Sequence, residues 1–157
     1  MKDNASVMEA YVMVGAPGSG KSTQVAKLMA LHPNAIVISG DDIRAELYGN
    51  ADIQGNYTEI HDRMLEILEE NVGRTVIMDG THYKAAYRKE ALAMLNSYGY
   101  TNVSAVVVDK SLAVCLKQNA SRDRKVPEHV IERMHNSLQA SLKNIYNEKF
   151  SHINFVY

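Results

Sequence analysis

GAPGSGKST, residues 15–23, is the stretch of sequence that decides the fold; it consists of Gly15, Ala16, Pro17, Gly18, Ser19, Gly20, Lys21, Ser22 and Thr23. It fits the phosphate-binding loop (Walker A) pattern G-x-x-x-x-G-K-[ST]. The glycines let the backbone curl with its N–H groups pointing inward, where side chains would collide with phosphate oxygens. An apolar run, residues 10–14, leads into the loop, and a helix-compatible run, residues 24–31, leaves it. A glycine-rich turn that binds nothing is the alternative, but this order of strand, loop and helix favours a nucleoside triphosphate site.

Two side chains of the loop have the chemistry for a triphosphate and its metal. Lys21 is placed to reach the β- and γ-phosphates, and the Ser22 hydroxyl is placed to bind Mg²⁺. The positive end of the following helix would face the same anion. We therefore expect ATP and Mg²⁺ as the donor and its metal, with Ser22 as the metal ligand from the chain.

The composition is that of one globular domain spanning residues 1–157, with 46% hydrophobic and 22% charged residues. There are 17 Lys and Arg residues against 18 Asp and Glu residues, so no global positive field is available to hold a long polyanion. A nucleic-acid partner would therefore be held locally, at an end, and not along a basic face. The oligomeric state does not follow from these properties.

The sequence gives no sign of a membrane partner. No apolar run approaches the ~18 residues that a membrane span needs. Residues 1–9 are polar, and we expect them to be frayed. The N-terminus also lacks the apolar core of a signal peptide. The single cysteine, Cys115, excludes an internal disulfide, and we expect a cytoplasmic protein.

Apolar runs that alternate with helical patterns predict the fold class. Strands are expected at residues 10–14, 35–39, 75–79 and 103–108, with residues 153–156 as a candidate fifth strand. Helices are expected at residues 24–31, 56–73, 84–98, 111–119 and 127–148, with a short one ending near residue 48. The pattern is typical of an α/β protein, a doubly wound parallel sheet of four to five strands with helices on both faces. Together with the phosphate loop, the pattern predicts a P-loop kinase fold with a helical lid, and ligands of such sheets bind at the carboxyl ends of the strands.

The second expected strand ends in Gly40-Asp41-Asp42-Ile43-Arg44, over the same sheet edge as the loop. Asp41 is placed to take the proton of an acceptor hydroxyl in phosphoryl transfer. Arg44, three residues on, would aim a cation at an acidic acceptor. The alternative is that an aspartate only caps the short helix and that Arg44 is surface charge. We expect both, with one aspartate capping and the other catalytic.

The third expected strand ends at Asp79, which is the Walker B arrangement of the phosphate-loop fold. Asp79 would orient Mg²⁺ through water or hold the acceptor, and capping of the next turn is the alternative. Thr81 and His82 follow as candidate acceptor contacts, although a lone histidine in a loop is more often incidental.

A cationic connector, residues 122–126, lies within a candidate lid at about residues 120–130. An arginine from such a lid neutralises charge on the transferring phosphoryl group, and Arg122 and Arg124 are the candidates. A solvated run of charges is the alternative. The position of the cations, between two helices that turn back over the site, favours the lid.

Taken together, these motifs resemble the kinase domain of phage-type polynucleotide 5′-kinases. The likeness runs from about Tyr11 to Ile145 and rests on the loop, on residues 41–44, on residues 79–81 and on residues 122–127. The resemblance implies that the lysine and hydroxyls of the loop hold ATP and Mg²⁺.

The same resemblance implies roles for residues across the cleft. Asp41 would be the general base for the 5′-hydroxyl, and Arg44 would hold the phosphate on the 3′ side of the terminal nucleotide. Arg122 is the best match to the lid arginine on the donor phosphates, but a lid one residue shorter leaves Arg124 as the other candidate. His82 stands where the family often has Asn, and residues 49–73 form a shorter segment than in the phage enzymes.

The leading hypothesis is an ATP-dependent kinase that phosphorylates the 5′-hydroxyl end of DNA or RNA, an activity suited to nucleic-acid end repair. A P-loop kinase of a small-molecule hydroxyl, on a sugar, an antibiotic or a nucleotide-sugar, is the second. A nucleotide-binding switch module is the third. It is disfavoured because Asp41 paired with Arg44 would then have no use.

Overall fold

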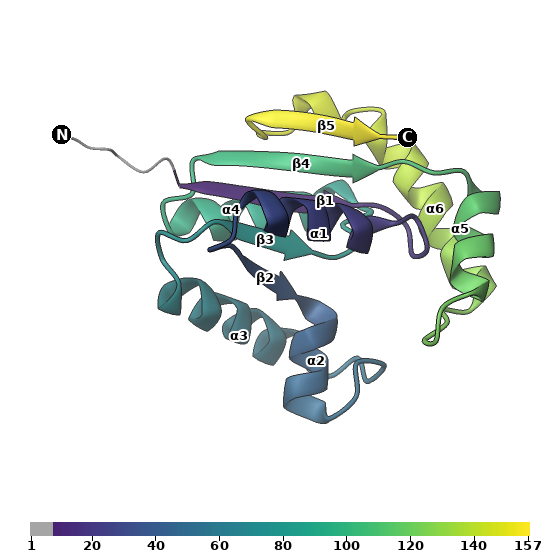
Figure 1. The fold of residues 1–157 in the computed structure, drawn as a ribbon, viewed down its shortest axis with the longest axis horizontal. Helices are drawn as coiled ribbons and strands as arrows, with labels where there is room; N and C mark the ends of the chain where they lie inside the picture. The colour runs from purple at the N-terminus through teal and green to yellow at the C-terminus, as the bar shows by residue number, and fades with distance from the viewer. Residues whose placement is uncertain (1–7) are drawn as a thin grey trace.

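The computed structural model describes residues 8–157, which form an α/β fold (Figure 1). Its strands are β1 (Glu9–Val14), β2 (Ile36–Ser39), β3 (Val76–Asp79), β4 (Asn102–Val108) and β5 (His152–Val156). Its helices are α1 (Lys21–Leu31), α2 (Gly40–Tyr48), α3 (Tyr57–Glu70), α4 (Ala85–Ser97), α5 (Leu112–Ala120) and α6 (Glu128–Leu142), followed by a 3₁₀ turn, η1 (Ile145–Asn147). None of these helices is long and apolar enough to cross a bilayer.

The expectation of a frayed segment at residues 1–9 falls mostly outside the described chain, which starts at residue 8. Within the described part the expectation is wrong for Glu9, because this residue already belongs to β1 and pairs with Asn102 of β4.

The strands form one parallel sheet in the order β2-β3-β1-β4-β5. β1 lies at the centre, where Val12 is level with Met78 of β3 and with Ala105 of β4. The expected doubly wound parallel sheet is confirmed, and the candidate fifth strand is part of it. Because β3 is inserted between β1 and β2, the loop that follows β1 lies beside the carboxyl end of β3.

Helices cover both faces of the sheet (Figure 1). On one face, α1 packs on Met13 and Ile77. On the other face, α3, α4 and α6 contribute Leu68, Leu95 and Leu138 to the larger core. Burial on both faces explains why the strand sequences are continuous apolar runs without polar alternation.

The sequence around the start of α3 carries a capping-box signal, Asn56 with Glu59 three residues on, and the structure follows it only in part. The Asn56 side chain accepts a hydrogen bond from the Glu59 N–H at 3.1 Å, as expected. The Glu59 carboxylate does not return the bond. It accepts instead from the Tyr48 hydroxyl at 2.7 Å, while the Asn56 N–H donates to that hydroxyl at 2.9 Å. Tyr48 thus joins the ends of α2 and α3, a role that no local pattern indicated.

The last helix is shorter than its sequence pattern predicts. The expectation that it continues to residue 148 is wrong, because α6 ends at Leu142 and the chain turns through η1. The turn brings Glu148 against the side chain of Arg88 on α4. This tertiary ion pair overrides a helical pattern that would have carried Glu148 away from the sheet.

Arg88 is a fully buried charge, with 0% of its surface exposed. Its Nε and one terminal nitrogen donate to the two carboxylate oxygens of Glu148, each at 2.7 Å. Its other terminal nitrogen donates to the His82 carbonyl at 2.9 Å and to the Ser141 hydroxyl at 3.1 Å. Arg88 therefore ties the loop after β3 to the carboxyl end of α6.

Replacement of Arg88 by methionine is expected to lower the free energy of unfolding by about 3–5 kcal/mol, because it leaves a largely buried carboxylate without its partner. Urea denaturation followed by circular dichroism measures this change. The control is Arg133→Met on the exposed face of α6, with an expected change within about 0.5 kcal/mol. Equal stability losses in the two variants would contradict the structural role of Arg88.

Candidate functional site

The loop between β1 and α1 packs so closely that side chains are excluded at two of its glycines. A Cβ atom at Gly15 would lie 2.7 Å from the Ser19 hydroxyl and 3.0 Å from the Val108 carbonyl oxygen. Gly18 has a φ of +81°, and a Cβ atom there would collide with the Cys115 carbonyl oxygen of α5. Both glycines are therefore required for the loop to lie against β4 and α5.

The amino end of α1 is left open for an anion. In the described structure no side chain caps α1, and its first turn has no acidic residue. Ser39, Asn56 and Ser111 cap α2, α3 and α5, whereas α4 and α6 also lack a side-chain cap. The backbone N–H groups of α1 and its positive dipole end are thus available to a phosphate.

Ser19 also marks this loop as a ligand site. Its side chain is 1% exposed, and among the described residues its hydroxyl is the buried side-chain polar atom that lacks a hydrogen-bond partner. A buried hydroxyl without a partner costs free energy, which a bound oxygen would recover. The orphaned hydroxyl, the tight glycine backbone and the open helix end fit a triphosphate, and Ser22 in the exposed first turn fits its Mg²⁺.

Lys21 folds back over the loop. Its ammonium group donates to the Gly15 carbonyl at 2.9 Å and to the Ala16 carbonyl at 3.1 Å. Burial lowers the pKa of Lys21 to about 8, the nearby Asp79 opposes this shift, and the positive charge of Arg122 adds to it. The lysine is therefore largely charged at neutral pH, held by carbonyls that a phosphate oxygen would replace.

Asp79 ends β3 beside the loop, at the position predicted for it. Burial raises the pKa of its carboxyl group, and the charge of Lys21 partly offsets this. The next residues fasten the β3 end to the phosphate loop, because the Gly15 N–H donates to the Thr81 carbonyl at 2.9 Å. The structure thus brings Asp79 and Thr81 to the same sheet edge as Lys21.

His82 has a positive φ of 44°, and its side chain turns toward β1. Its Nδ1 lies 2.6 Å from the Met13 carbonyl oxygen. Burial lowers the pKa of His82, so the ring is neutral at pH 7. One ring nitrogen is therefore engaged in holding the loop to the sheet. Whether the ring also contacts an acceptor remains a prediction.

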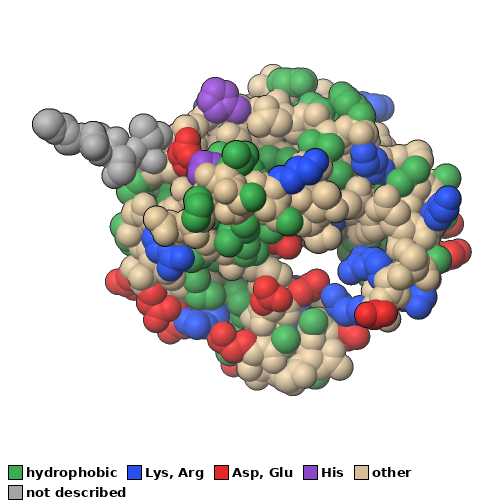
Figure 2. Space-filling model, viewed as in Figure 1, with side chains coloured by type: hydrophobic (Ala, Val, Ile, Leu, Met, Phe, Trp, Pro, Cys, Tyr) green, Lys and Arg blue, Asp and Glu red, His purple; other side chains and the backbone are tan. Residues whose placement is uncertain are grey.

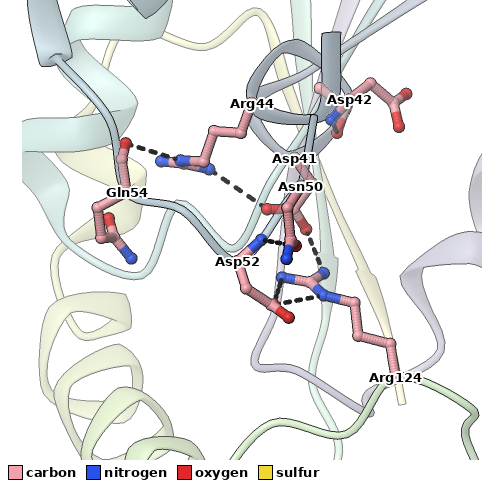
Figure 3. A network of polar contacts seen from close by, with 8 residues as sticks. Asp41, Asp42, Arg44, Asn50, Asp52, Gln54 and Arg124 are labelled. Atoms are coloured by element: carbon pink, nitrogen blue, oxygen red, sulfur yellow. Dashed lines mark hydrogen bonds and ion pairs between the residues drawn. The ribbon is translucent and has the colours of Figure 1, made fainter. Parts of the chain in front are cut away.

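At the end of β2 the two aspartates differ in their surroundings. Asp41 pairs with Arg44 through Oδ1 at 3.3 Å, whereas the Asp42 side chain points to the other side of α2 (Figure 3). The expectation that an aspartate caps this helix is wrong: Ser39 is the cap, and its hydroxyl accepts from the Asp42 N–H at 3.3 Å. Ser39 takes the role because α2 starts earlier than expected, at Gly40.

The segment predicted to be a lid contains a short loop with a fixed base. The buried Asn119 side chain donates to the Val126 carbonyl at 2.8 Å and accepts from the Val126 N–H at 2.9 Å. Residues 121–125 between them are exposed. The lid therefore forms a closed loop at the carboxyl end of α5, which itself contacts Gly18 of the phosphate loop.

Arg124 extends from the lid across the cleft to α2 and the loop after it (Figure 3). One of its terminal nitrogens lies 3.1 Å from Oδ2 of Asp41, and another lies 2.7 Å from Oδ1 of Asp52. Figure 2 shows the cleft as an opening that charged side chains of both signs bridge at its edge. Arg124 is 40% exposed and Asp41 55%, so each ion pair contributes only about 0–1 kcal/mol.

Arg122 is exposed, and its positive charge lowers the pKa of the Lys21 ammonium group. Arg124, by contrast, is held by ion pairs with Asp41 and Asp52.

A pocket of about 230 Å³ opens on the far side of Arg44 from Asp41. It lies between α3, α4 and the loop before α3, and its walls include Arg44, Tyr57, Ile60, His61, Met64 and Glu90. The Arg44 guanidinium separates this pocket from Asp41, with its Nε donating to the Gln54 carbonyl at 3.3 Å.

Sequence reasoning missed several residues that the structure brings to this site. Asp52 holds the lid arginine, Arg88 fastens the loop after β3, and Asn119 closes the lid. Tyr57 and Glu90 line the pocket from two helices. No pattern in the sequence marks these residues, because each acts through a partner on another element.

Comparison with known proteins gives one match to a family. A family model described as "AAA domain" matches residues 11–141, which is most of the chain. No curated protein matches the sequence.

Solved structures share the fold at low sequence identity. A chain of the Pnkp1/Rnl/Hen1 RNA repair complex has a TM-score of 0.76 at 19% identity, and the match covers 91% of this chain and 48% of that chain. A fungal RNA kinase has a TM-score of 0.69 at 17% identity, covering 96% and 38% of the two chains. A gluconokinase from Sinorhizobium meliloti 1021 has a TM-score of 0.55 at 19% identity, covering 96% and 82%. The chain spans about half or less of the first two structures, and these likenesses show a P-loop kinase fold.

Binding of ATP is expected to weaken as the pH rises through about 8, because the charge that Lys21 offers to the phosphates is lost above its pKa. If only the ammonium form binds, affinity falls about tenfold between pH 7 and pH 9. Calorimetric titration at several pH values measures this dependence. Lys21→Met is the control and should bind weakly, with no such decline. A decline that persists in Lys21→Met would assign it to another group.

Proposed function

The chain belongs to the AAA domain family, and from this premise we propose that it is an ATP-dependent kinase of the 5′-hydroxyl end of DNA or RNA. The observation that carries the proposal is the pairing of Asp41 with Arg44, at 3.3 Å, across the cleft from Lys21. A carboxylate beside a cation at the acceptor side suits a hydroxyl whose molecule also bears a phosphate.

The chemistry divides between the two sides of the cleft. On the donor side the loop amides and Lys21 hold the triphosphate, and Arg122 adds positive charge where the γ-phosphoryl group leaves. Mg²⁺, when bound at Ser22, supplies charge neutralisation on the phosphate oxygens. On the acceptor side Asp41 takes the proton of the 5′-hydroxyl. The oxygen of the 5′-hydroxyl then bonds to the γ-phosphorus. At the same time the bond between the γ-phosphorus and the oxygen of the β-phosphate breaks, and ADP leaves.

Arg44 gives the acceptor side its selectivity in this proposal. Its guanidinium is partly buried and offers several donors in a plane, which matches a phosphodiester next to the terminal sugar. Asp79, Thr81 and His82 lie along the same edge and complete the acceptor side. In this proposal Asp41 recognises the hydroxyl of the acceptor, and Arg44 recognises the phosphate next to it.

Two of the structures that share the fold support this choice, since they are described as an RNA repair complex and an RNA kinase. The balanced net charge supports binding at an end and not along a groove. A kinase of a small-molecule hydroxyl is the second candidate. The small volume of the pocket beside Arg44 favours it, and a gluconokinase shares the fold.

An acceptor assay tests the proposal. Labelled ATP and Mg²⁺ are incubated with 5′-hydroxyl oligonucleotides, with nucleosides that bear or lack a 3′-phosphate, and with sugars. Label is expected in the oligonucleotides and in the nucleoside 3′-phosphate, because only these offer Arg44 a phosphate. Labelling of a sugar alone would favour the second candidate, and labelling of none of these acceptors would overturn both.

Asp41→Asn is expected to lower kcat about 10²- to 10⁴-fold, the usual contribution of a general base. ATP affinity should stay within about twofold, because Asp41 lies across the cleft from the phosphate loop. The matched control is Asp42→Asn, which removes the neighbouring charge on the opposite side of α2 (Figure 3). Single-turnover rates and ATP titrations separate the two effects. Full activity in Asp41→Asn would show that another group takes the proton.

The two lid arginines are expected to differ in effect. Arg122→Gln should lower kcat about 10³-fold, as expected for an arginine that neutralises the transferring group. Arg124→Gln should lower it less than about tenfold, because its charge faces Asp41 and not the donor phosphates. Single-turnover kinetics at saturating ATP compare the two variants. The opposite order would transfer the donor role to Arg124.

A further inference from the structure

The pocket beside Arg44 contains a pair of aromatic rings, one exposed and one partly buried, that the proposed chemistry does not use. Tyr57 and His61 lie one turn apart on α3, with ring centroids 5.8 Å apart and planes inclined by 29°. Tyr57 is 63% exposed, although it borders a pocket with the apolar side chains of Ile60 and Met64. The exposed Tyr57 ring, with the partly buried His61 ring and an apolar wall beside it, forms a surface on which another flat ring can stack.

The tyrosine ring is held in place by a contact between two helices. The Tyr57 hydroxyl donates to Oε1 of Glu90 on α4. This carboxylate raises the pKa of Tyr57 to about 12, so the ring stays neutral at any ordinary pH. A fixed aromatic ring loses little freedom when a ligand stacks on it, which favours binding.

Arg44 connects the pocket to the site of chemistry. It lines the pocket, and its terminal nitrogen contacts Asp41 at 3.3 Å. A phosphate held by Arg44 would lie between the two, next to the general base on one side and the aromatic pair on the other. A group within one nucleotide of that phosphate would therefore reach the pocket.

We propose that this pocket binds the nucleobase of the acceptor's 5′-terminal nucleotide, stacked on the Tyr57–His61 pair, with its phosphate on Arg44. This proposal rests on the proposed function. It adds the base to the hydroxyl and the phosphate as a third part of the acceptor that the site recognises. A volume of about 230 Å³ lies below the range of about 300–1,000 Å³ that is usual for pockets of whole small-molecule ligands, which suits a part of a ligand such as one base. Stacking tolerates all four bases, because every base presents a flat aromatic face.

The test compares two 5′-hydroxyl oligonucleotides that differ only in the terminal residue, which carries either adenine or an abasic tetrahydrofuran. Loss of stacking on one base is expected to raise KM for the abasic oligonucleotide about tenfold or more in the unmodified protein. Tyr57→Ala should raise KM for the adenine end by a similar factor and leave the abasic end unchanged. Tyr57→Phe keeps the ring but loses its bond to Glu90, so it should raise KM much less than Tyr57→Ala does.

His61→Ala provides a second variant on the same pair, and Tyr146→Ala, at an exposed ring on η1, is the matched control. Tyr57→Ala and His61→Ala should both lose the preference for the adenine end, and Tyr146→Ala should keep it. Equal KM values for the two oligonucleotides in the unmodified protein would overturn the pocket assignment while the kinase activity stands. Absence of transfer to either one would overturn the proposed function, and the pocket assignment with it.

Discussion

The close approach of the phosphate loop to α5 constrains the rest of the site. Gly18 lies against the Cys115 carbonyl with no room for a side chain, so the loop packs directly against α5. The lid begins where α5 ends and is closed at its base by Asn119. The base of the predicted lid is therefore placed beside the phosphate loop by this close contact and by the core contact of Ala16 and Cys115.

A second unit is built around β3. Arg88 holds the His82 carbonyl, His82 holds the Met13 carbonyl of β1, and the Gly15 N–H binds the Thr81 carbonyl. These bonds fasten the Walker B side of the cleft to the same loop. Phosphoryl transfer needs the two sides of the cleft to be held in fixed positions, because the protein contributes mainly by positioning charged groups. The exposed start of α2 and the exposed tip of the predicted lid are the parts that contact each other across the cleft.

Much of this arrangement follows from the sequence, for a physical reason. The phosphate loop and the apolar strands predict a parallel sheet, and a parallel sheet brings strand ends to one edge. Asp41 and Asp79 therefore lie at the predicted edge even though residues 42–78 separate them along the chain. Sequence patterns thus predict the features that depend on residues close together in the chain.

The rest depends on contacts between distant segments. Asp52 meets Arg124, and Tyr57 meets Glu90, with nothing in the local sequence to indicate either pair. The cap of α2 and the end of α6 differ from expectation for the same reason, because Ser39 and Glu148 have partners that their neighbours in sequence do not reveal.

The double pairing of Asp41 makes one contact between distant parts of the chain sensitive to salt. Arg44 contacts one carboxylate oxygen at 3.3 Å, and Arg124 contacts the other at 3.1 Å. These side chains are between 26% and 55% exposed, so dissolved ions screen the attraction between them. The contact between α2 and the loop after α5 is therefore expected to loosen as the ionic strength rises.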